Sequence, residues 1–255
     1  MKTQQNKILL ITIGVVAVLI IALAAFLLFR PIRDDSGDPI PRGLKHTVES
    51  GVAVVTGYGG NDPLVTIPAE IDGRPVGVIG YEAFKNNLTL TGVVLPDSVV
   101  SIGVSAFSGC KNLSQVTIPQ GLRSVGTDSF LNCANLLEIT LPFGVETVGR
   151  GAFDGCINLK SVSLPGSVSA INEYAFRNCR SLTELVIPGS LQSIGAGVFY
   201  GCRNLVSVFF EGDKPVLTDP IYKVFYDAGE ELRITYRRGA LNWGTTWDDY
   251  PTEKV

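Results

Sequence analysis

The sequence is nearly without histidine, and His46 is its single copy. Serine and cysteine hydrolases need a histidine or a comparable base beside the nucleophile. A structural zinc site needs four ligands that converge tetrahedrally. One histidine without a recognisable partner argues against both kinds of site, and we expect His46 to be an ordinary surface residue.

Basic clusters and nucleotide-binding loops are also missing. The net charge is only -3, from 21 Lys and Arg against 24 Asp and Glu, and no basic stripe is interleaved with aromatic residues. Nucleic-acid-binding proteins usually carry such a stripe. The phosphate-binding pattern GxxxxGK[ST] does not occur either. We therefore expect no enzyme activity, no nucleic-acid partner, no metal and no cofactor.

Cysteine is scarce but regularly placed. The five cysteines recur every 23 residues, as Cys110, Cys133, Cys156, Cys179 and Cys202. A fixed interval indicates one structural unit repeated along a solenoid. Parallel side chains on neighbouring coils hold their Cβ atoms too far apart for a disulfide. We expect this column to be buried free thiols, which behave as small apolar residues.

The repeat carries further columns, and residues 91–205 hold five full copies. Each copy opens with apolar residues two positions apart, as in a short strand. A proline then ends the strand, and a second apolar pair follows. Next comes glycine, or Asn172 in one copy, which we interpret as a position of positive φ. A phenylalanine column, expected to fill the core, is Phe84, Phe107, Phe130, Phe153, Phe176 and Phe199.

Taken together, the unit reads Leu-x-x-Ile-x-Ile-Pro-x-x-Val-x-x-Ile-Gly-x-x-Ala-Phe-x-x-Cys. This pattern resembles the bacterial leucine-rich repeats of the BspA or Treponema pallidum type. The resemblance implies a leucine-rich-repeat solenoid of 23-residue coils with short parallel strands, capped at both ends. Its parts are a cap and first coil (44–90), five repeats (91–205), and a degenerate coil with a C-terminal cap (206–255).

Within the two caps, the sequence makes two more specific predictions. Residues 44–67 contain two strand-like runs separated by the turn-rich segment 57–63. Trp243 and Trp247 are interpreted as large amphipathic residues that cover the last coil.

The N-terminus contains a long apolar run. Residues 8–29 are 22 consecutive residues without a charge, enough for about 33 Å of helix. This length predicts a transmembrane helix, with residues 1–7 as a short cytoplasmic tail, 30–43 as a linker, and the repeats outside the cell. The alternative is secretion after signal cleavage near Ala22–Ala24, although the run continues beyond that site to Phe29.

Outward positions of the first strand form the candidate partner-binding face. Its residues are Val94, Thr117, Thr140, Ser163, Val186 and Phe209, with Gln115, Glu138, Ser161 and Glu184 beside them. The competing interpretation is that these are solvent-exposed residues of high β-propensity.

The family resemblance implies a function for this face. We expect a membrane-anchored, extracellularly displayed binding module, protein-binding or adhesin-like, whose partner is a protein or glycan such as host matrix. The alternative is a structural or scaffolding component of the cell envelope without an external ligand. The identity of the ligand and the oligomeric state do not follow from the sequence.

Overall fold

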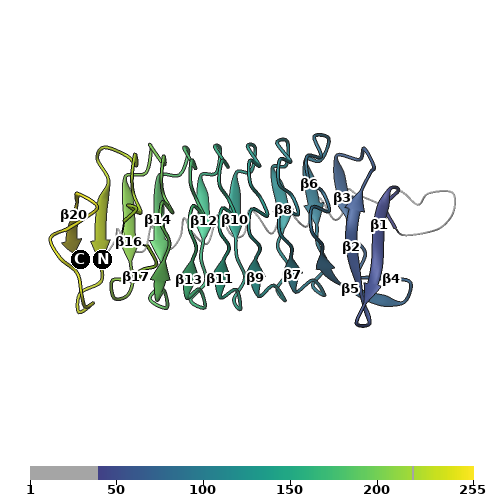
Figure 1. Cartoon of the computed structure of the whole chain (residues 1–255), viewed down its shortest axis with the longest axis horizontal. Helices are drawn as coiled ribbons and strands as arrows, with labels where there is room; N and C mark the ends of the chain where they lie inside the picture. The colour runs from purple at the N-terminus through teal and green to yellow at the C-terminus, as the bar shows by residue number, and fades with distance from the viewer. Residues whose placement is uncertain (1–39, 220) are drawn as a thin grey trace, which may run out of the picture. The chain divides into compact units, whose positions relative to one another are not determined.

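The computed structural model describes residues 40–219 and 221–255, which form a solenoid of short strands and turns (Figure 1). The predicted tail 1–7, transmembrane helix 8–29 and most of the linker 30–43 lie outside the described residues. Within the described ranges, no helix has the length and apolarity needed to cross a membrane.

Each repeat opens with a short strand, as the apolar alternation predicts. These strands are β6 (Gly92–Val94), β8 (Gln115–Thr117), β10 (Glu138–Thr140), β12 (Ser161–Ser163), β14 (Glu184–Ile187) and β16 (Ser207–Phe210). Those that pair do so in parallel, in the 23-residue register of the sequence. Hydrogen bonding on this side is interrupted, giving the strand groups β3-β6-β8, β10-β12 and β14-β16-β18-β20-β19. The remaining members are β3 (Leu64–Thr66), β18 (Arg233–Tyr236), β19 (Thr246–Trp247) and β20 (Tyr250–Lys254).

The continuous sheet lies on the other side of the coils. It has ten strands, in the order β1-β2-β5-β7-β9-β11-β13-β15-β17, with β4 paired to β5. Its repeat strands are β7 (Ser101–Ile102), β9 (Ser124–Val125), β11 (Thr147–Val148), β13 (Ala170–Ile171), β15 (Ser193–Ile194) and β17 (Val216–Leu217). The others are β1 (Leu44–Glu49), β2 (Val52–Tyr58), β4 (Glu70–Ile71) and β5 (Arg74–Ile79). The second apolar pair of each repeat therefore ends in a strand that the sequence analysis missed.

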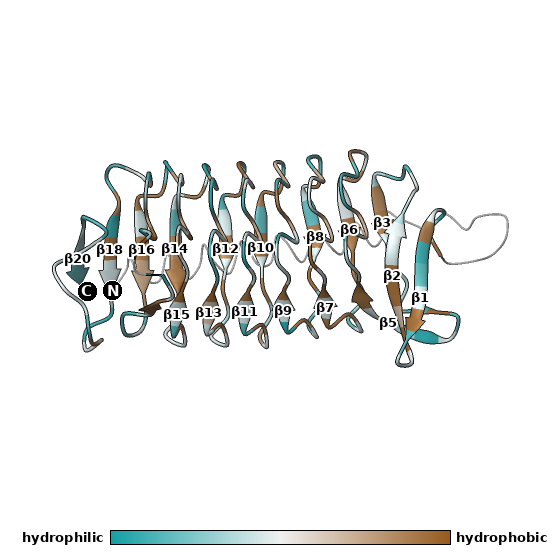
Figure 2. Cartoon of the chain, in the orientation of Figure 1, coloured by the Kyte–Doolittle hydropathy of each residue, from teal (hydrophilic) through white to brown (hydrophobic). Residues whose placement is uncertain are grey.

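A phenylalanine ladder fills the core between the continuous sheet, the opening strands and the turns. Its rings stack with centroids 5.0 to 5.9 Å apart and planes 4° to 13° from parallel. Phe225 extends the ladder although it follows Phe199 by 26 residues rather than 23. Hydrophobic residues recur at matching places on successive strands (Figure 2), so every coil adds the same apolar layer.

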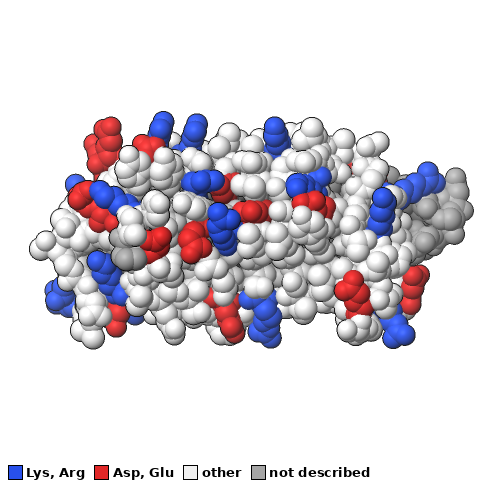
Figure 3. Space-filling model, in the orientation of Figure 1, with Lys and Arg blue, Asp and Glu red and all other residues white. Residues whose placement is uncertain are grey.

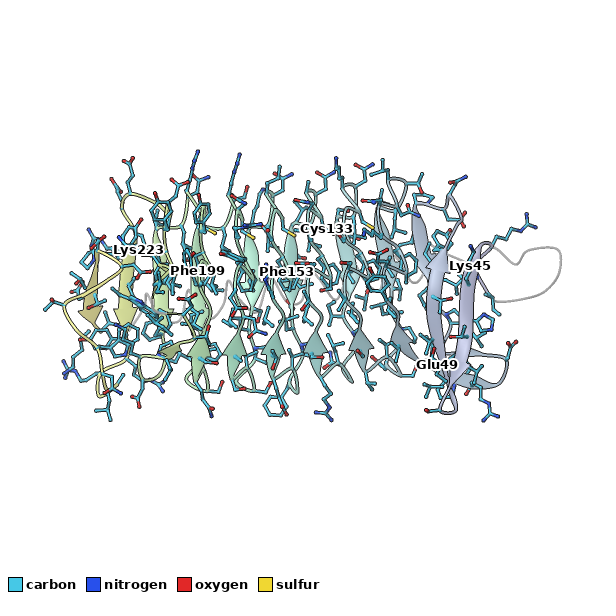
Figure 4. All side chains as sticks on the ribbon, viewed as in Figure 1. Lys45, Glu49, Cys133, Phe153, Phe199 and Lys223 are labelled. Carbon is cyan, nitrogen blue, oxygen red and sulfur yellow. The ribbon has the colours of Figure 1, made fainter. Side chains whose placement is uncertain are left out.

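The cysteine column lies beside this ladder, buried and free. Each thiol donates a hydrogen bond to the carbonyl of the phenylalanine 26 residues earlier, at Sγ–O distances of 2.9 to 3.2 Å. Figure 4 labels Cys133 together with the ladder residues Phe153 and Phe199. Burial raises the pKa of the thiols, to about 12 for Cys110 and Cys202 and well above the ordinary value for Cys133 and Cys179.

The prediction of positive φ for the repeat glycine is wrong. Gly103, Gly126, Gly149, Asn172 and Gly195 all lack positive φ. The glycine is needed because the preceding coil approaches closely: a Cβ on Gly149 would lie 2.5 Å from the carbonyl oxygen of Val125.

Positive φ occurs instead in two other columns of the repeat, one of which alternates asparagine with glycine. Its members are Asn86, Gly109, Asn132, Gly155, Asn178 and Gly201. A Cβ on Gly155 would lie 2.2 Å from Oδ1 of Asn132. The asparagine side chain of one coil therefore occupies the space over the glycine of the next, and the coils match in pairs.

Both ends of the stack are covered. At the N-terminal end, β1 and β2 form an antiparallel hairpin around Ser50 and Gly51, so the first predicted strand-like run is in fact two strands. The two turn residues have φ of 49° and 84°, as in a type I′ turn. Tyr58 packs on Phe84 with centroids 5.6 Å apart.

At the C-terminal end, the two tryptophans cover the last coil. Trp247 is 3% exposed and meets Phe225 edge-on at 5.4 Å. Trp243 stacks on Tyr236 at 4.9 Å. The lone histidine lies at the other end, where it is partly exposed, with Nε2 2.8 Å from Oδ2 of Asp72.

Candidate binding surface

The strand face predicted from the sequence is a surface of mostly small side chains. Val94 and Phe209 are half-buried, and the other eight residues of the face are exposed. Paired strands place the rows in register, for example Thr140 beside Ser163 and Val186 beside Phe209. The face crosses the two interruptions between β8 and β10 and between β12 and β14. It offers many modest contacts and lacks a cluster of large side chains.

A second exposed surface, on the turn side of the last coils, is hollowed. We name it the tyrosine cleft, and its volume is about 440 Å³. Its lining residues are Tyr174, Arg177, Gly197, Tyr200, Ile221, Tyr222, Lys223 and Tyr226. They come from the turns after β13, β15 and β17, so three successive coils contribute.

The core ladder positions two of these tyrosines. Tyr200 and Tyr226 directly follow Phe199 and Phe225, whose rings point inward, so the tyrosine rings lie on the outside of the same turns. The two tyrosine rings stack at 5.4 Å with planes 20° apart. The equivalent residue one coil earlier is Arg177, which continues the column.

A buried carboxylate holds Arg177 in place. Asp154 is 4% exposed and accepts bonds from Nε and Nη2 of Arg177 at 2.9 and 2.5 Å. Its second oxygen accepts from Nδ2 of Asn178 at 3.3 Å. The hydrogen bond from Arg177 to Asp154 raises the pKa of the guanidinium, which lies 4.7 Å over the ring of Tyr174. The arginine is thereby fixed as one wall of the cleft.

The other cation of the cleft is also paired. Lys223 forms an ion pair with Asp249, and this hydrogen bond raises the pKa of the ammonium group. Positive and negative side chains are interspersed on the face of the molecule shown in Figure 3. With both of its cations already partnered, the cleft is aromatic and close to neutral.

The outer rim of the cleft leaves large hydrophobic groups in solvent. Tyr226 is 56% exposed, Tyr222 58% and Ile221 82%. Contiguous exposed apolar groups of this kind are typical of interaction sites, whereas single ones are common on any surface. The sequence did contain a signal for the cleft. The residue after the core phenylalanine is a tyrosine only at Tyr200 and Tyr226.

Another hollow lacks the aromatic side chains of the tyrosine cleft. It has a volume of about 500 Å³ and lies between the turns at Gly189–Gln192 and Gly212–Lys214, without an aromatic ring in its lining. Across residues 40–219 and 221–255, no three His, Cys, Asp or Glu side chains gather as metal ligands.

Comparison with known families identifies the repeat. The model of the BspA type Leucine rich repeat region matches residues 77–213 in six copies. This chain belongs to that leucine-rich repeat family. The match begins within β5 and ends before β17, so the caps lie outside it.

Solved structures include similar solenoids. A leucine-rich repeat protein of T. pallidum is 31% identical, with a TM-score of 0.69, over 75% of this chain and 91% of the other. A leucine-rich cell surface protein of Faecalibacterium prausnitzii A2-165 is 24% identical over 85% of this chain and 76% of the other. Its TM-score of 0.54 shows a shared fold. No curated protein matches this chain.

These comparisons confirm the predicted family and repeat fold. The relatives are leucine-rich repeat proteins, whose fold serves as a scaffold for binding surfaces rather than as a dedicated catalytic architecture. The function is therefore to be sought in residues that depart from the repeat on an exposed surface, and the lining of the tyrosine cleft is such a group.

Proposed function

We propose that this chain is a protein-binding, adhesin-like module that holds its partner in the tyrosine cleft. The observation that carries the proposal is the gathering of four tyrosines and a fixed arginine around one exposed hollow. Tyrosine and arginine dominate the energetics of protein interfaces because they present large rigid contact areas together with polar groups.

The side chains of the cleft are already held in place, which supports this function. Arg177 is held by Asp154, and Tyr200 is held against Tyr226, so a partner would immobilise few rotatable groups on binding. The paired cations leave no excess positive charge, which favours a partner that makes aromatic and apolar contacts over a polyanion. The strand face would add peripheral contacts along the solenoid.

We propose further that the module is displayed at the cell surface through residues 8–29. The run of 22 uncharged residues supports an anchor, and the F. prausnitzii relative is described as a cell surface protein. Protease added to intact cells is then expected to remove the repeats. Full protection of the repeats, with cleavage only after lysis, would contradict the display.

Binding is tested with the purified chain on surfaces coated with host matrix proteins and with mucin. The double variant Tyr222→Ser and Tyr226→Ser removes the two most exposed rings of the cleft. The matched control, Glu138→Lys and Glu184→Lys, alters the strand face to a comparable extent. We expect the cleft variant to lose roughly tenfold or more in affinity, and the control to keep its binding.

Three other results would change the assignment. Loss of binding only in the strand-face variant would move the site to the predicted rows. Binding to mucin that disappears after deglycosylation would indicate a glycan partner. Capture solely of the cell's own envelope proteins would favour the scaffolding alternative.

A further inference from the structure

Among the described residues, β1 is the edge strand of the ten-stranded sheet. β1 pairs with β2 on one side, and no other described strand pairs with it. Its residues Lys45, Thr47, Val48 and Glu49 are exposed, Val48 to 51%. An edge strand of six residues presents unpaired backbone groups that can accept another strand.

The hairpin fixes which backbone groups face outward. Glu49 and Val52 flank the two-residue turn, so the N–H and C=O of Glu49 are directed toward β2. Because these directions alternate along a strand, those of His46 and Val48 are directed away from β2. A second strand can therefore bond to β1 at His46 and Val48.

The side chains of this edge are complementary to themselves. Lys45, Thr47 and Glu49 project from the same face of β1, since every second residue of a strand does so. Figure 4 shows Lys45 and Glu49 along the same terminal strand. We propose that two copies of this chain associate by antiparallel pairing of β1 around Thr47, which places Lys45 of each copy opposite Glu49 of the other.

Charge selects this register among the possible ones. Centring the two-fold axis on Thr47 opposes His46 with Val48, the two residues with outward backbone groups, and forms two cross-strand ion pairs. Centring it on Lys45 would oppose two lysines. Centring it on His46 or Val48 would form no ion pair. A lysine on an edge strand usually discourages pairing, but here each copy supplies the matching carboxylate.

Cysteine cross-linking of the full chain in detergent tests the pairing. In a non-hydrogen-bonded pair the two Thr47 Cα atoms would be about 4.5 Å apart, within disulfide range. The native thiols are buried, so they do not compete. We expect Thr47→Cys to form a disulfide-linked dimer under mild oxidation, and Thr140→Cys, on the exposed strand face, to remain monomeric.

Charge reversal then tests the register in the Thr47→Cys background. Lys45→Glu or Glu49→Lys alone turns both ion pairs into repulsive pairs and should lower the cross-linking rate roughly tenfold. The double reversal restores both pairs and should recover the rate, as should mixing the two single variants. Circular dichroism checks that each variant is folded.

Three results would overturn the proposal. Equal cross-linking of Thr47→Cys and Thr140→Cys would show that the edge has no special affinity for itself. A Thr47→Cys thiol that is covered by another segment of its own chain would show that the edge is not open to a second copy. Failure of the double reversal to recover what the single reversals lose would show that Lys45 and Glu49 do not face each other.

Discussion

At the residue scale, the cysteine column is part of the packing of the core. Each thiol lies beside the phenylalanine ladder and donates to a phenylalanine carbonyl, so it fills space and satisfies a backbone acceptor at once. The 23-residue interval predicts the burial of these residues. The hydrogen bond from each thiol to the carbonyl 26 residues earlier depends on how one coil packs on the next.

The thiols should make stability fall in alkaline solution. Below about pH 9 the thiols stay protonated in both the folded and the unfolded protein. Above about pH 9 the thiols of the unfolded protein ionise. Those of the folded protein do not, because folding raises the pKa to about 12 for Cys110 and Cys202. Each thiol then lowers the free energy of unfolding by up to about 1.4 kcal/mol per pH unit.

Urea unfolding at a series of pH values between about 8 and 11 measures this slope. Cys156→Ala serves as the control, since it removes one thiol and should reduce the slope by that thiol's share. Tyr58, whose pKa burial raises to about 12, contributes in the same direction in both proteins. An identical slope in the alanine variant would assign the effect to other groups.

At the element scale, strands of two to four residues form the repeats, and such strands are stable only against their neighbours. The opening strands are predictable because their apolar residues alternate and, in the five full repeats, a proline follows the strand. The two-residue strands of the continuous sheet give no period that could reveal them, and only the β-branched residue at the end of β7, β9, β11, β13 and β15 is a signal. The role of the repeat glycine could not be predicted from the sequence either, since glycine is required by the contact between coils and not by the local backbone conformation.

Gly149→Ala should therefore destabilise the protein by about 1–3 kcal/mol, because its Cβ would meet backbone atoms that cannot move aside. Gly166 offers a matched control: it lacks positive φ, and its Cβ would meet nothing within 4 Å. Gly166→Ala should be neutral or stabilising by up to about 1 kcal/mol. Thermal and urea unfolding of both variants measure the difference, and equal losses would refute the close-approach explanation.

At the scale of the whole molecule, the ladder runs from Tyr58 to Trp247 without a break. In a solenoid each coil contacts only its neighbours, so stability is nearly a sum of coil and interface contributions. Removing a cap should then loosen the coils next to it and leave the far end intact. The five thiols, one per repeat, report such local opening along the stack.

Trp247→Ala removes the ring that covers Phe225 and should cost about 3–5 kcal/mol at the C-terminal end. We expect Cys202 to react with a thiol reagent much faster than in the unmodified protein, and Cys110 to react at an unchanged rate. Mass spectrometry of peptides separates the two sites. Uniform acceleration at all five cysteines would contradict the nearest-neighbour description.

Trp247→Phe is the matched control for this experiment. The indole Nε1 is buried without an acceptor among the described residues, so phenylalanine keeps the apolar cover and loses no hydrogen bond. Its effect on Cys202 should be much smaller than that of alanine.

The repeat, the buried columns of phenylalanine and cysteine, and the tryptophan cover follow from the sequence alone, because periodic apolar residues can be buried only by stacking identical coils. The side that carries the continuous sheet, the need for glycine before the phenylalanine, and the place where exposed aromatic rings gather do not. Those features arise from contacts between coils. Tyr174, Tyr200 and Tyr226 are distant in the sequence and become one cleft only when three turns lie side by side.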